Sequence, residues 1–228
     1  MIKFTKFILP VCFLATASIS LAKEPSKGDV QARITEIKQE IKQIARENID
    51  RTDNFLEVRN QLQPLVNEIV ELSPNRLEAE KLDQVVGAWR NLWSDQEFGP
   101  GTDPKQVYQS VSPDGYYYNI SLANTPRGEF TNFLRGAYND EGSYLRIEFT
   151  DNALTEGFYE PGTEIFELAE DFEAGKIEAN SIPGPIGVKG VLINLYVDED
   201  LRIVTGNSTS DSALRLFVLE RVESISFE

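Results

Sequence analysis

The residue types that most often carry catalysis are nearly absent from this chain. It has no His, and its single Cys, Cys12, lies in an apolar N-terminal segment. Nucleophilic catalysis by Ser or Cys needs a neighbouring base, and no G-x-S-x-G motif occurs. A His- or Cys-based zinc or haem site is excluded by composition, and no Gly-rich phosphate-binding loop is present.

Carboxylates are the remaining groups with catalytic chemistry. Paired carboxylates could act as general acid and base, but with 37 Asp and Glu in the chain such pairs arise by chance. The run Asp198-Glu199-Asp200 does not fit an EF-hand loop, which needs a Gly and a Glu at fixed later positions. The sequence therefore predicts a protein that is not an enzyme, with no catalytic residue, no metal ligand and no cofactor.

Aromatic side chains and one arginine fit ligand binding better than catalysis. The predicted ligand-binding residues are Trp89, Phe133, Phe149, Tyr196 and Arg202. Aromatic rings at alternating strand positions can line an apolar cavity, although the same rings can also fill a small β-barrel completely. If Arg202 points inward, it would hold a polar head group or a buried carboxylate, with Glu148 as the expected partner. The alternative is a solvated acidic turn in which Arg202 forms a surface ion pair.

These residues lie in a part of the chain whose apolar pattern is typical of β-strands. From Gly87 onward apolar residues alternate with a period of two, and turn signals such as Asp114-Gly115 separate the runs. The alternation predicts three shared faces: Tyr116, Tyr118, Ile120 and Leu122; Leu145, Ile147 and Phe149; and Val191, Ile193, Leu195 and Val197. Leu201 and Ile203 share a face opposite Arg202, so one of these two faces is expected to meet solvent. Several short strands without β–α–β alternation predict an antiparallel sandwich or barrel, and the acidic stretch 160–173 is predicted to be a solvated face.

A helical segment is predicted before the strands. Its first apolar stripe recurs at spacings of four and three, as in an amphipathic helix, and consists of Val30, Ile34, Ile37, Ile41 and Ile44. A second stripe runs from Phe55 to Leu72. Pro64 lies inside it and is expected to break or kink the helix, because proline lacks the backbone donor. The two stripes could pack on each other, across the barrel, or against another chain.

The first 22 residues have the pattern of a secretory signal peptide. Lys3 and Lys6 precede an apolar stretch over residues 7–17, and Ser20-Leu21-Ala22 offers small residues for cleavage. An uncleaved membrane anchor is the alternative, and the shortness of the apolar run disfavours it. Cleavage would leave 20 Lys and Arg against 37 Asp and Glu and change the net charge from −15 to −17. Such a chain is repelled by nucleic acid and by anionic lipids.

Three segments resemble a known family. Leu82-Asp83-Gln84-Val85-Val86-Gly87-Ala88-Trp89 precedes the strands, and Tyr196-Val197-Asp198-Glu199-Asp200-Leu201-Arg202-Ile203 and Phe217-Val218-Leu219 follow near the end. This order is similar to the plastid lipid-associated protein (fibrillin or plastoglobulin) family, over about Leu56 to Val222. The chain departs from that family where three residues separate Asp83 from Gly87, where Thr205 stands in place of a frequent Arg, and in its longer loop at 206–212.

The resemblance implies a mainly β fold, namely a lipocalin-like antiparallel β-barrel preceded by an amphipathic helical segment. It also implies binding of lipophilic small molecules and association with lipid globules or membranes. A secretory signal in place of a plastid transit peptide points to an exported bacterial or cyanobacterial relative, in the periplasm or the thylakoid lumen. The predicted domains are a signal peptide (1–22), a linker (23–29), a helical segment (30–81) and the barrel (82–228).

The predicted function is binding or carriage of a lipophilic small molecule, such as a lipid, a quinone or a carotenoid-like compound. The alternative is a structural or interaction protein whose barrel is filled and whose helices dock on a partner or a lipid surface. The volume of the barrel cavity separates these hypotheses. Nucleic acid is not an expected partner, and the sequence leaves the oligomeric state open, with pairing through the N-terminal helices as one arrangement.

Overall fold

The computed structural model describes residues 26–51, 53–73, 78–140 and 144–227, so the predicted signal peptide lies outside the described residues. The helices in this part are α1 (Lys27–Asn48), α2 (Phe55–Leu72), α3 (Glu78–Val85) and α4 (Ile165–Glu173). The strands are β1 (Gly87–Ser94), β2 (Thr102–Val111), β3 (Tyr116–Thr125), β4 (Gly128–Asp140), β5 (Leu145–Glu156), β6 (Asn180–Ser181), β7 (Lys189–Val197), β8 (Leu201–Ser208) and β9 (Arg215–Arg221).

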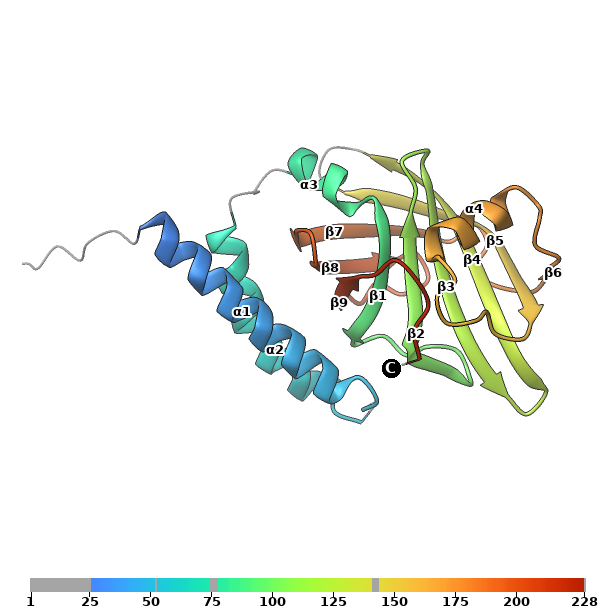
Figure 1. Cartoon of the computed structure of the whole chain (residues 1–228), viewed down its shortest axis with the longest axis horizontal. Coiled ribbons are helices and arrows are strands. Elements are labelled where there is room, and N and C mark those ends of the chain that lie inside the picture. The colour runs from blue at the N-terminus through green and yellow to red at the C-terminus, as the bar shows by residue number, and fades with distance from the viewer. Residues whose placement is uncertain (1–25, 52, 74–77, 141–143, 228) are drawn as a thin grey trace, which may run out of the picture.

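Eight strands form a closed antiparallel β-barrel, which confirms the predicted fold class. Neighbouring strands follow the order β1, β2, β3, β4, β5, β7, β8 and β9 around the ring. The last strand pairs with the first, so that Trp89 lies opposite Arg221 and Arg90 opposite Glu220. The strand β7 pairs with the first part of β5, at Leu145 to Glu148, and the short β6 pairs with a later part, at Ala153 and Leu154. Figure 1 shows this ring of strands with the helices outside it.

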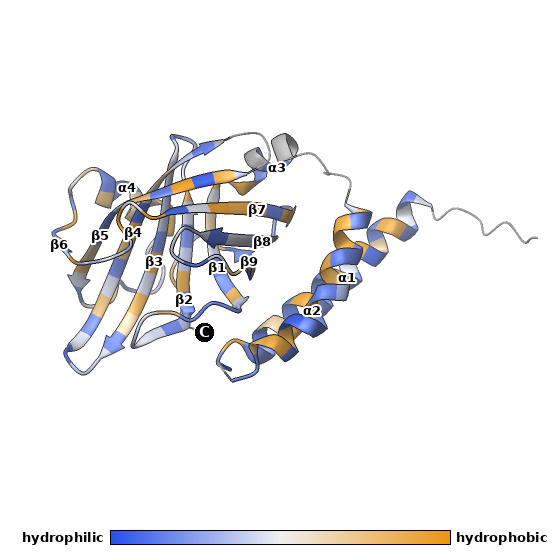
Figure 2. Cartoon of the chain, turned by 180° about the vertical axis from the view of Figure 1, so that it is seen from behind, coloured by the Kyte–Doolittle hydropathy of each residue, from blue (hydrophilic) through white to orange (hydrophobic). Residues whose placement is uncertain are grey.

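The helices α1 and α2 form a hairpin that packs on the outside of the barrel (Figures 1 and 2). The buried core at this contact includes Ile37, Ile41, Leu62 and Ile69 from the helices and Leu201, Ile203, Leu216 and Val218 from β8 and β9. The two predicted stripes thus pack on each other and on the barrel. Leu201 and Ile203 face the helices and Arg202 faces the interior, and all three are fully buried. The expectation that one of these faces meets solvent was wrong, because the helical hairpin covers the outer face.

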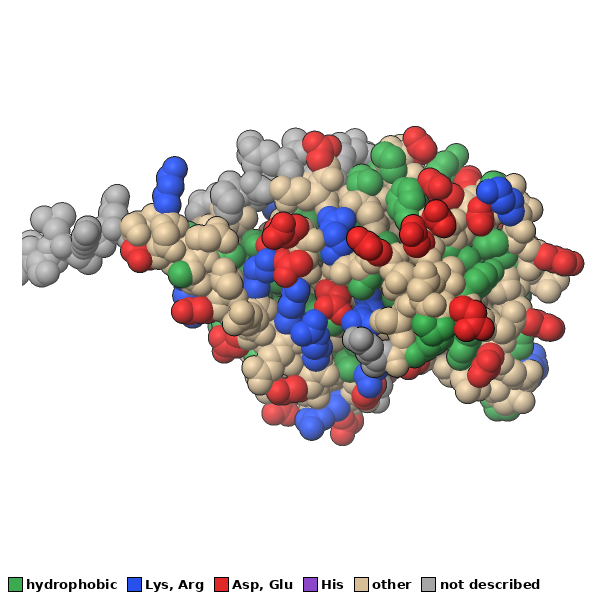
Figure 3. Space-filling view, in the orientation of Figure 1, with side chains coloured by type: hydrophobic (Ala, Val, Ile, Leu, Met, Phe, Trp, Pro, Cys, Tyr) green, Lys and Arg blue, Asp and Glu red, His purple; other side chains and the backbone are tan. Residues whose placement is uncertain are grey.

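Charged residues surround this apolar contact. Lys38 Nζ lies 2.6 Å from Asp198 Oδ2, and Lys42 Nζ lies 2.8 Å from Asp200 Oδ2, in the turn between β7 and β8. The acidic turn is therefore a docking point for α1, which corrects its interpretation as a solvated turn. Figure 3 shows basic and acidic side chains gathered over this junction of hairpin and barrel.

The helix boundaries differ from the predicted ones for local reasons. Because Ser26 Oγ accepts a hydrogen bond from Asp29 N and Asp29 Oδ2 accepts one from Ser26 N, α1 begins at Lys27, inside the predicted linker. The helix α2 runs through Pro64, so the break that was one of the two expected outcomes does not occur. Pro64 and Asn60 are both exposed, so water can bond the Asn60 carbonyl that proline leaves without a donor.

The acidic stretch 160–173 contains a packed helix, which corrects its assignment as a solvated face. Ile165, Leu168 and Ala169 of α4 are buried against the outside of the barrel, while Glu167 and Glu170 are exposed. The apolar residues of α4 are spaced by three and one, as one face of a helix requires. The outer barrel residues that share this core include Tyr118, Ile120, Leu122 and Phe133. The predicted common face of β3 is therefore real, but it points outward.

A bulge in β7 changes which residues face the interior. The register with β8 shifts between Asn194 and Tyr196. As a result Leu195 and Tyr196 both pack toward the helices, whereas Val197 joins the interior core. The predicted single face from Val191 to Val197 therefore ends at the bulge. In β5, by contrast, Leu145, Ile147 and Phe149 share the interior face as predicted.

Candidate functional site

The interior of the barrel contains a cavity of about 690 Å³. It opens at the end of the barrel where β1 connects to β2 and β8 connects to β9, because the exposed residues Gln96 and Asp211 of these connections belong to its lining. At the other end the interior is filled by a cluster that contains Val85, Trp89, Val111, Leu145 and Val197. The barrel therefore has the form of a cup with one open end.

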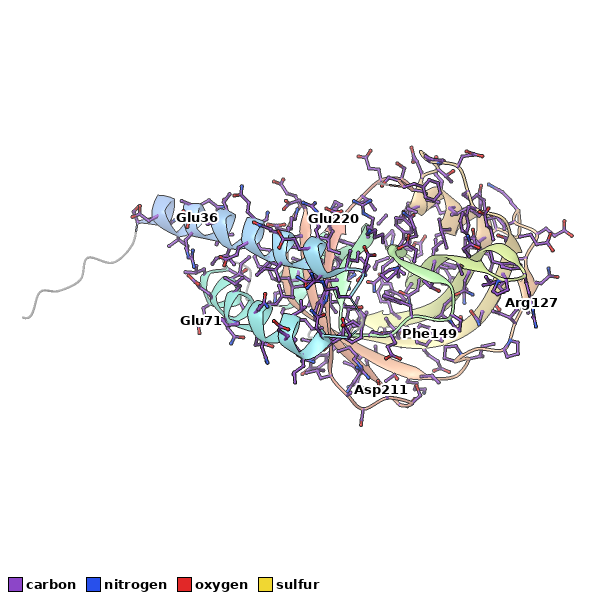
Figure 4. The ribbon with its side chains drawn as sticks, turned by 90° about the horizontal axis from the view of Figure 1, so that it is seen from below. Glu36, Glu71, Arg127, Phe149, Asp211 and Glu220 are labelled. Atoms are coloured by element: carbon purple, nitrogen blue, oxygen red, sulfur yellow. The ribbon has the colours of Figure 1, made fainter. Side chains whose placement is uncertain are left out.

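One wall of the cup is apolar. It is formed by Ile147 and Phe149 of β5, Leu192 of β7, and Phe217 and Leu219 of β9. Phe149, Leu192 and Phe217 point inward and yet keep part of their surface accessible, as expected of side chains that border an empty space. In Figure 4 Phe149 lies within the ring of strands, whereas Asp211 lies on a loop at the edge of the molecule.

Glycine leaves room for one side chain of this apolar wall. Gly206 pairs with Leu192 across β8 and β7. A Cβ atom on Gly206 would lie 2.6 Å from Leu192 Cδ2. A larger residue at this position would therefore force Leu192 to move.

The other wall is polar and lies on β2, β3 and β4. It is formed by Gln109, Asn119, Ser121 and Asn132. Gln109 lies opposite Asn119, and Ser121 lies opposite Asn132, so the four side chains form two adjacent cross-strand pairs. We call this set the polar wall. All four side chains are uncharged.

Arg202 lies beneath the cavity and supports the polar wall. Its Nε donates to Asn194 Oδ1 at 2.8 Å and its Nη1 donates to Gln109 Oε1 at 3.2 Å. Its guanidinium carbon lies 5.9 Å from the centre of the Trp89 ring, within the range of a cation–π contact. Arg202 thus connects β8 with β7 and β2 through the interior.

Tyr117 holds a second amide of the polar wall. Burial raises the pKa of the Tyr117 phenol, so the hydroxyl stays protonated and can donate. It donates to Asn119 Oδ1 at 2.9 Å. Asn132 is held from the other side, because its Nδ2 donates to Asn152 Oδ1 at 2.9 Å and to Ala153 O at 3.1 Å.

The helical hairpin fixes the rim of the cup. Arg59 Nη1 donates to Asp95 Oδ2 at 2.5 Å and to Leu214 O at 2.7 Å. Asp95 Oδ1 in turn accepts from Leu216 N at 2.7 Å, at the start of β9. Phe55 at the start of α2 belongs to the cavity lining. The hairpin is therefore part of the entrance.

The predicted ligand-binding residues fall into three groups. Phe149 lines the cavity. Trp89 and Arg202 face the interior but lie in the floor, outside the lining. Phe133 and Tyr196 lie outside the barrel, where Phe133 stacks on Phe172 of α4 with ring centres 4.6 Å apart, and Tyr196 packs under the helical hairpin. The prediction that these two residues line the cavity was therefore wrong, because they belong to the core outside the barrel. The expected pairing of Glu148 with Arg202 was also wrong, because Glu148 pairs with Lys189 at the surface.

Sequence reasoning missed the polar wall. The alternation along β3 is plain and predicts a shared apolar face, but it does not tell whether that face points into the barrel or away from it. Because α4 covers the outside, the apolar face points outward and the face with Tyr117, Asn119 and Ser121 lines the interior. The available signal was weak: among the inward residues of β3, only Tyr117 is a large side chain of the kind that is usually buried.

Comparison with protein-family models, with curated proteins and with solved structures gives no match. Within the part of the chain that the structure describes, no group of three or more acidic side chains is placed to hold a metal ion. No helix in the described ranges is long and apolar enough to cross a membrane.

Proposed function

We propose that this protein binds and carries a lipophilic small molecule, such as a lipid, a quinone or a carotenoid-like compound, inside its barrel. The observation that carries this proposal is the cavity of about 690 Å³ with Phe149, Leu192 and Phe217 on one wall. A volume of this size is typical of small-molecule sites, which lie near 300–1,000 Å³. Each buried methylene of a ligand would contribute about 0.8 kcal/mol.

Two observations weigh against the alternative of a structural protein with a filled barrel. The interior is hollow, with half-buried inward side chains such as Phe149 and Asn132. The apolar stripes of α1 and α2 are buried against the barrel, so they do not offer a face to a lipid surface. Kinship with the plastid lipid-associated protein family and export to the periplasm or thylakoid lumen remain proposals that rest on the sequence segments described above.

Binding of the neutral apolar fluorophore N-phenyl-1-naphthylamine tests this function. We expect saturable binding with micromolar affinity, and displacement by 1-alkanols whose affinity rises about fourfold with each added methylene. Leu134→Trp, in the cavity lining, should narrow the space and weaken binding. Asn139→Trp, at an exposed position of the same strand, is the matched control and should bind as the original protein does. Absence of saturable binding, or equal binding by the two variants, would refute the proposed function.

A further inference from the structure

We propose that the ligand is an uncharged amphiphile with hydroxyl or carbonyl groups along one side, and not a plain hydrocarbon chain. This inference rests on the binding function proposed above and deepens it. It is drawn from the amides of the polar wall. Each of these amides has one end held by the protein and the other end open to the cavity.

The orientation of Gln109 is fixed by its partner. A guanidinium can only donate hydrogen bonds, so the amide oxygen must be the atom that faces Arg202 Nη1 at 3.2 Å. The Nε2 group is then the end that remains for the cavity. No residue in the described part of the chain accepts a hydrogen bond from it. The deep part of the polar wall therefore presents a donor.

The orientation of Asn132 is fixed in the opposite sense. The carbonyl of Ala153 can only accept, so the amide nitrogen of Asn132 must be the atom 3.1 Å from it. The Oδ1 atom is left as an acceptor for the cavity, and none of the described residues donates to it. Asn119 adds a donor, because its oxygen is taken by Tyr117.

The polar wall is therefore preorganised. Its deep part presents donors at Gln109 and Asn119. Nearer the entrance by one pair of residues, it presents an acceptor at Asn132 beside the Ser121 hydroxyl. A ligand oxygen would accept from the deep amides, and a ligand hydroxyl would donate to Asn132. A hydrocarbon chain against this wall would strip water from the amides without replacing the hydrogen bonds, which is costly.

The absence of a net charge on the ligand follows from where the charged lining residues lie. In the lining, the described charged residues are Asp95, Glu97, Asp211 and Arg215, and all four belong to the rim. Arg202 is also charged, but it lies in the floor behind Gln109 and Asn194 and is not part of the lining. A charged group inside the cup would therefore be desolvated without an ion partner in the wall, which costs several kcal/mol. The class that fits both walls is thus a neutral molecule with one apolar side and one side that carries oxygen atoms.

Two steroid esters of equal skeleton test this class. Methyl cholate has three hydroxyl groups on one face, and methyl 5β-cholanate has none. The affinity of each is measured by displacement of N-phenyl-1-naphthylamine, and the ratio of the two affinities is compared between proteins. We expect Asn132→Leu to lower the preference for methyl cholate about tenfold, the loss of one well-placed hydrogen bond.

Asn139→Leu is the matched control, because Asn139 is an exposed residue of the same strand, and it should leave the ratio unchanged. Ser121→Ala, which removes a single hydroxyl, should lower the ratio in the same direction and replaces the Asn132 variant if that one does not fold. An equal ratio in all proteins, or a bound fluorophore that neither ester displaces, would overturn the inference. Failure of the fluorophore itself to bind would overturn the proposed function instead.

Discussion

Arg202 is the residue whose replacement best tests the interior described above. It is fully buried, and Asn194 Oδ1 and Gln109 Oε1 accept its hydrogen bonds. Arg202→Ala would leave both acceptors without these donors and would remove the contact with Trp89. Because a buried acceptor that loses its donor costs about 1–3 kcal/mol, we expect the free energy of unfolding to fall by about 3 kcal/mol, measured by urea denaturation.

Arg127→Ala is the control for this measurement. Arg127 is exposed at the turn between β3 and β4 and projects away from the barrel (Figure 4). Its replacement should change the free energy of unfolding by no more than about 0.5 kcal/mol. If the two variants unfolded at the same urea concentration, Arg202 would not have the interior role assigned to it.

At the scale of elements, the contact between α1 and the turn between β7 and β8 makes the stability of the protein depend on pH. Burial alone would raise the pKa of Asp200, but hydrogen bonds from Lys38 and Lys42 outweigh it and hold the pKa well below its usual range. A carboxyl whose pKa is depressed by folding contributes stability that is present above its unfolded pKa, about 3.9, and is lost as pH falls through the folded value. About half of the Asp200 side chain, 48%, remains exposed, so solvent screening limits the effect to about 1 kcal/mol.

We therefore expect Asp200→Asn to lower the urea midpoint at pH 7 and to lose less stability than the original protein between pH 4 and pH 2. Asp114→Asn, an exposed acid at the turn before β3, should have the same pH dependence as the original protein. Urea melts at several pH values make the comparison. Parallel pH curves for the original protein and the Asp200 variant would contradict the coupling.

The sequence predicts the elements of this molecule better than it predicts which side of each element faces the cavity. The alternation in β5 correctly places Ile147 and Phe149 in the interior, because Arg146 and Glu148 on the other face are solvated. In β3 both faces are covered, so hydrophobicity does not tell inside from outside. In β7 the bulge after Asn194 shifts the alternation by one residue, and no residue type marks it.

The candidate site was predictable only in part for the same reason. Phe149 was identified from an alternating strand, whereas Asn119 and Asn132 have the residue types of an ordinary solvated surface. Their placement inside depends on α4, and α4 itself was overlooked because acidic residues are interspersed among its apolar ones. Long-range packing, and not local propensity, decides these positions.

At the scale of the whole molecule, the proposed export predicts where the mature chain starts. Lys3, Lys6 and the small residues at Ser20 and Ala22 fit cleavage after Ala22. We expect N-terminal sequencing of the protein from its native host to begin at Lys23, and thiol labelling to find no cysteine, because Cys12 would have been removed. A chain that starts at Met1 in a membrane fraction would contradict this prediction.

The closing of the ring by its first and last strands also bears on how the protein is made. Arg90 and Glu220 face each other across this seam although 130 residues separate them in the chain. Both β1 and β8 lack one neighbour until the ribosome has added β9. Pairings between such distant segments form slowly. The ring therefore closes only after nearly all of its strands have been synthesised. For a chain that must cross a membrane before it folds, as we propose for this one, the delay keeps it competent for translocation.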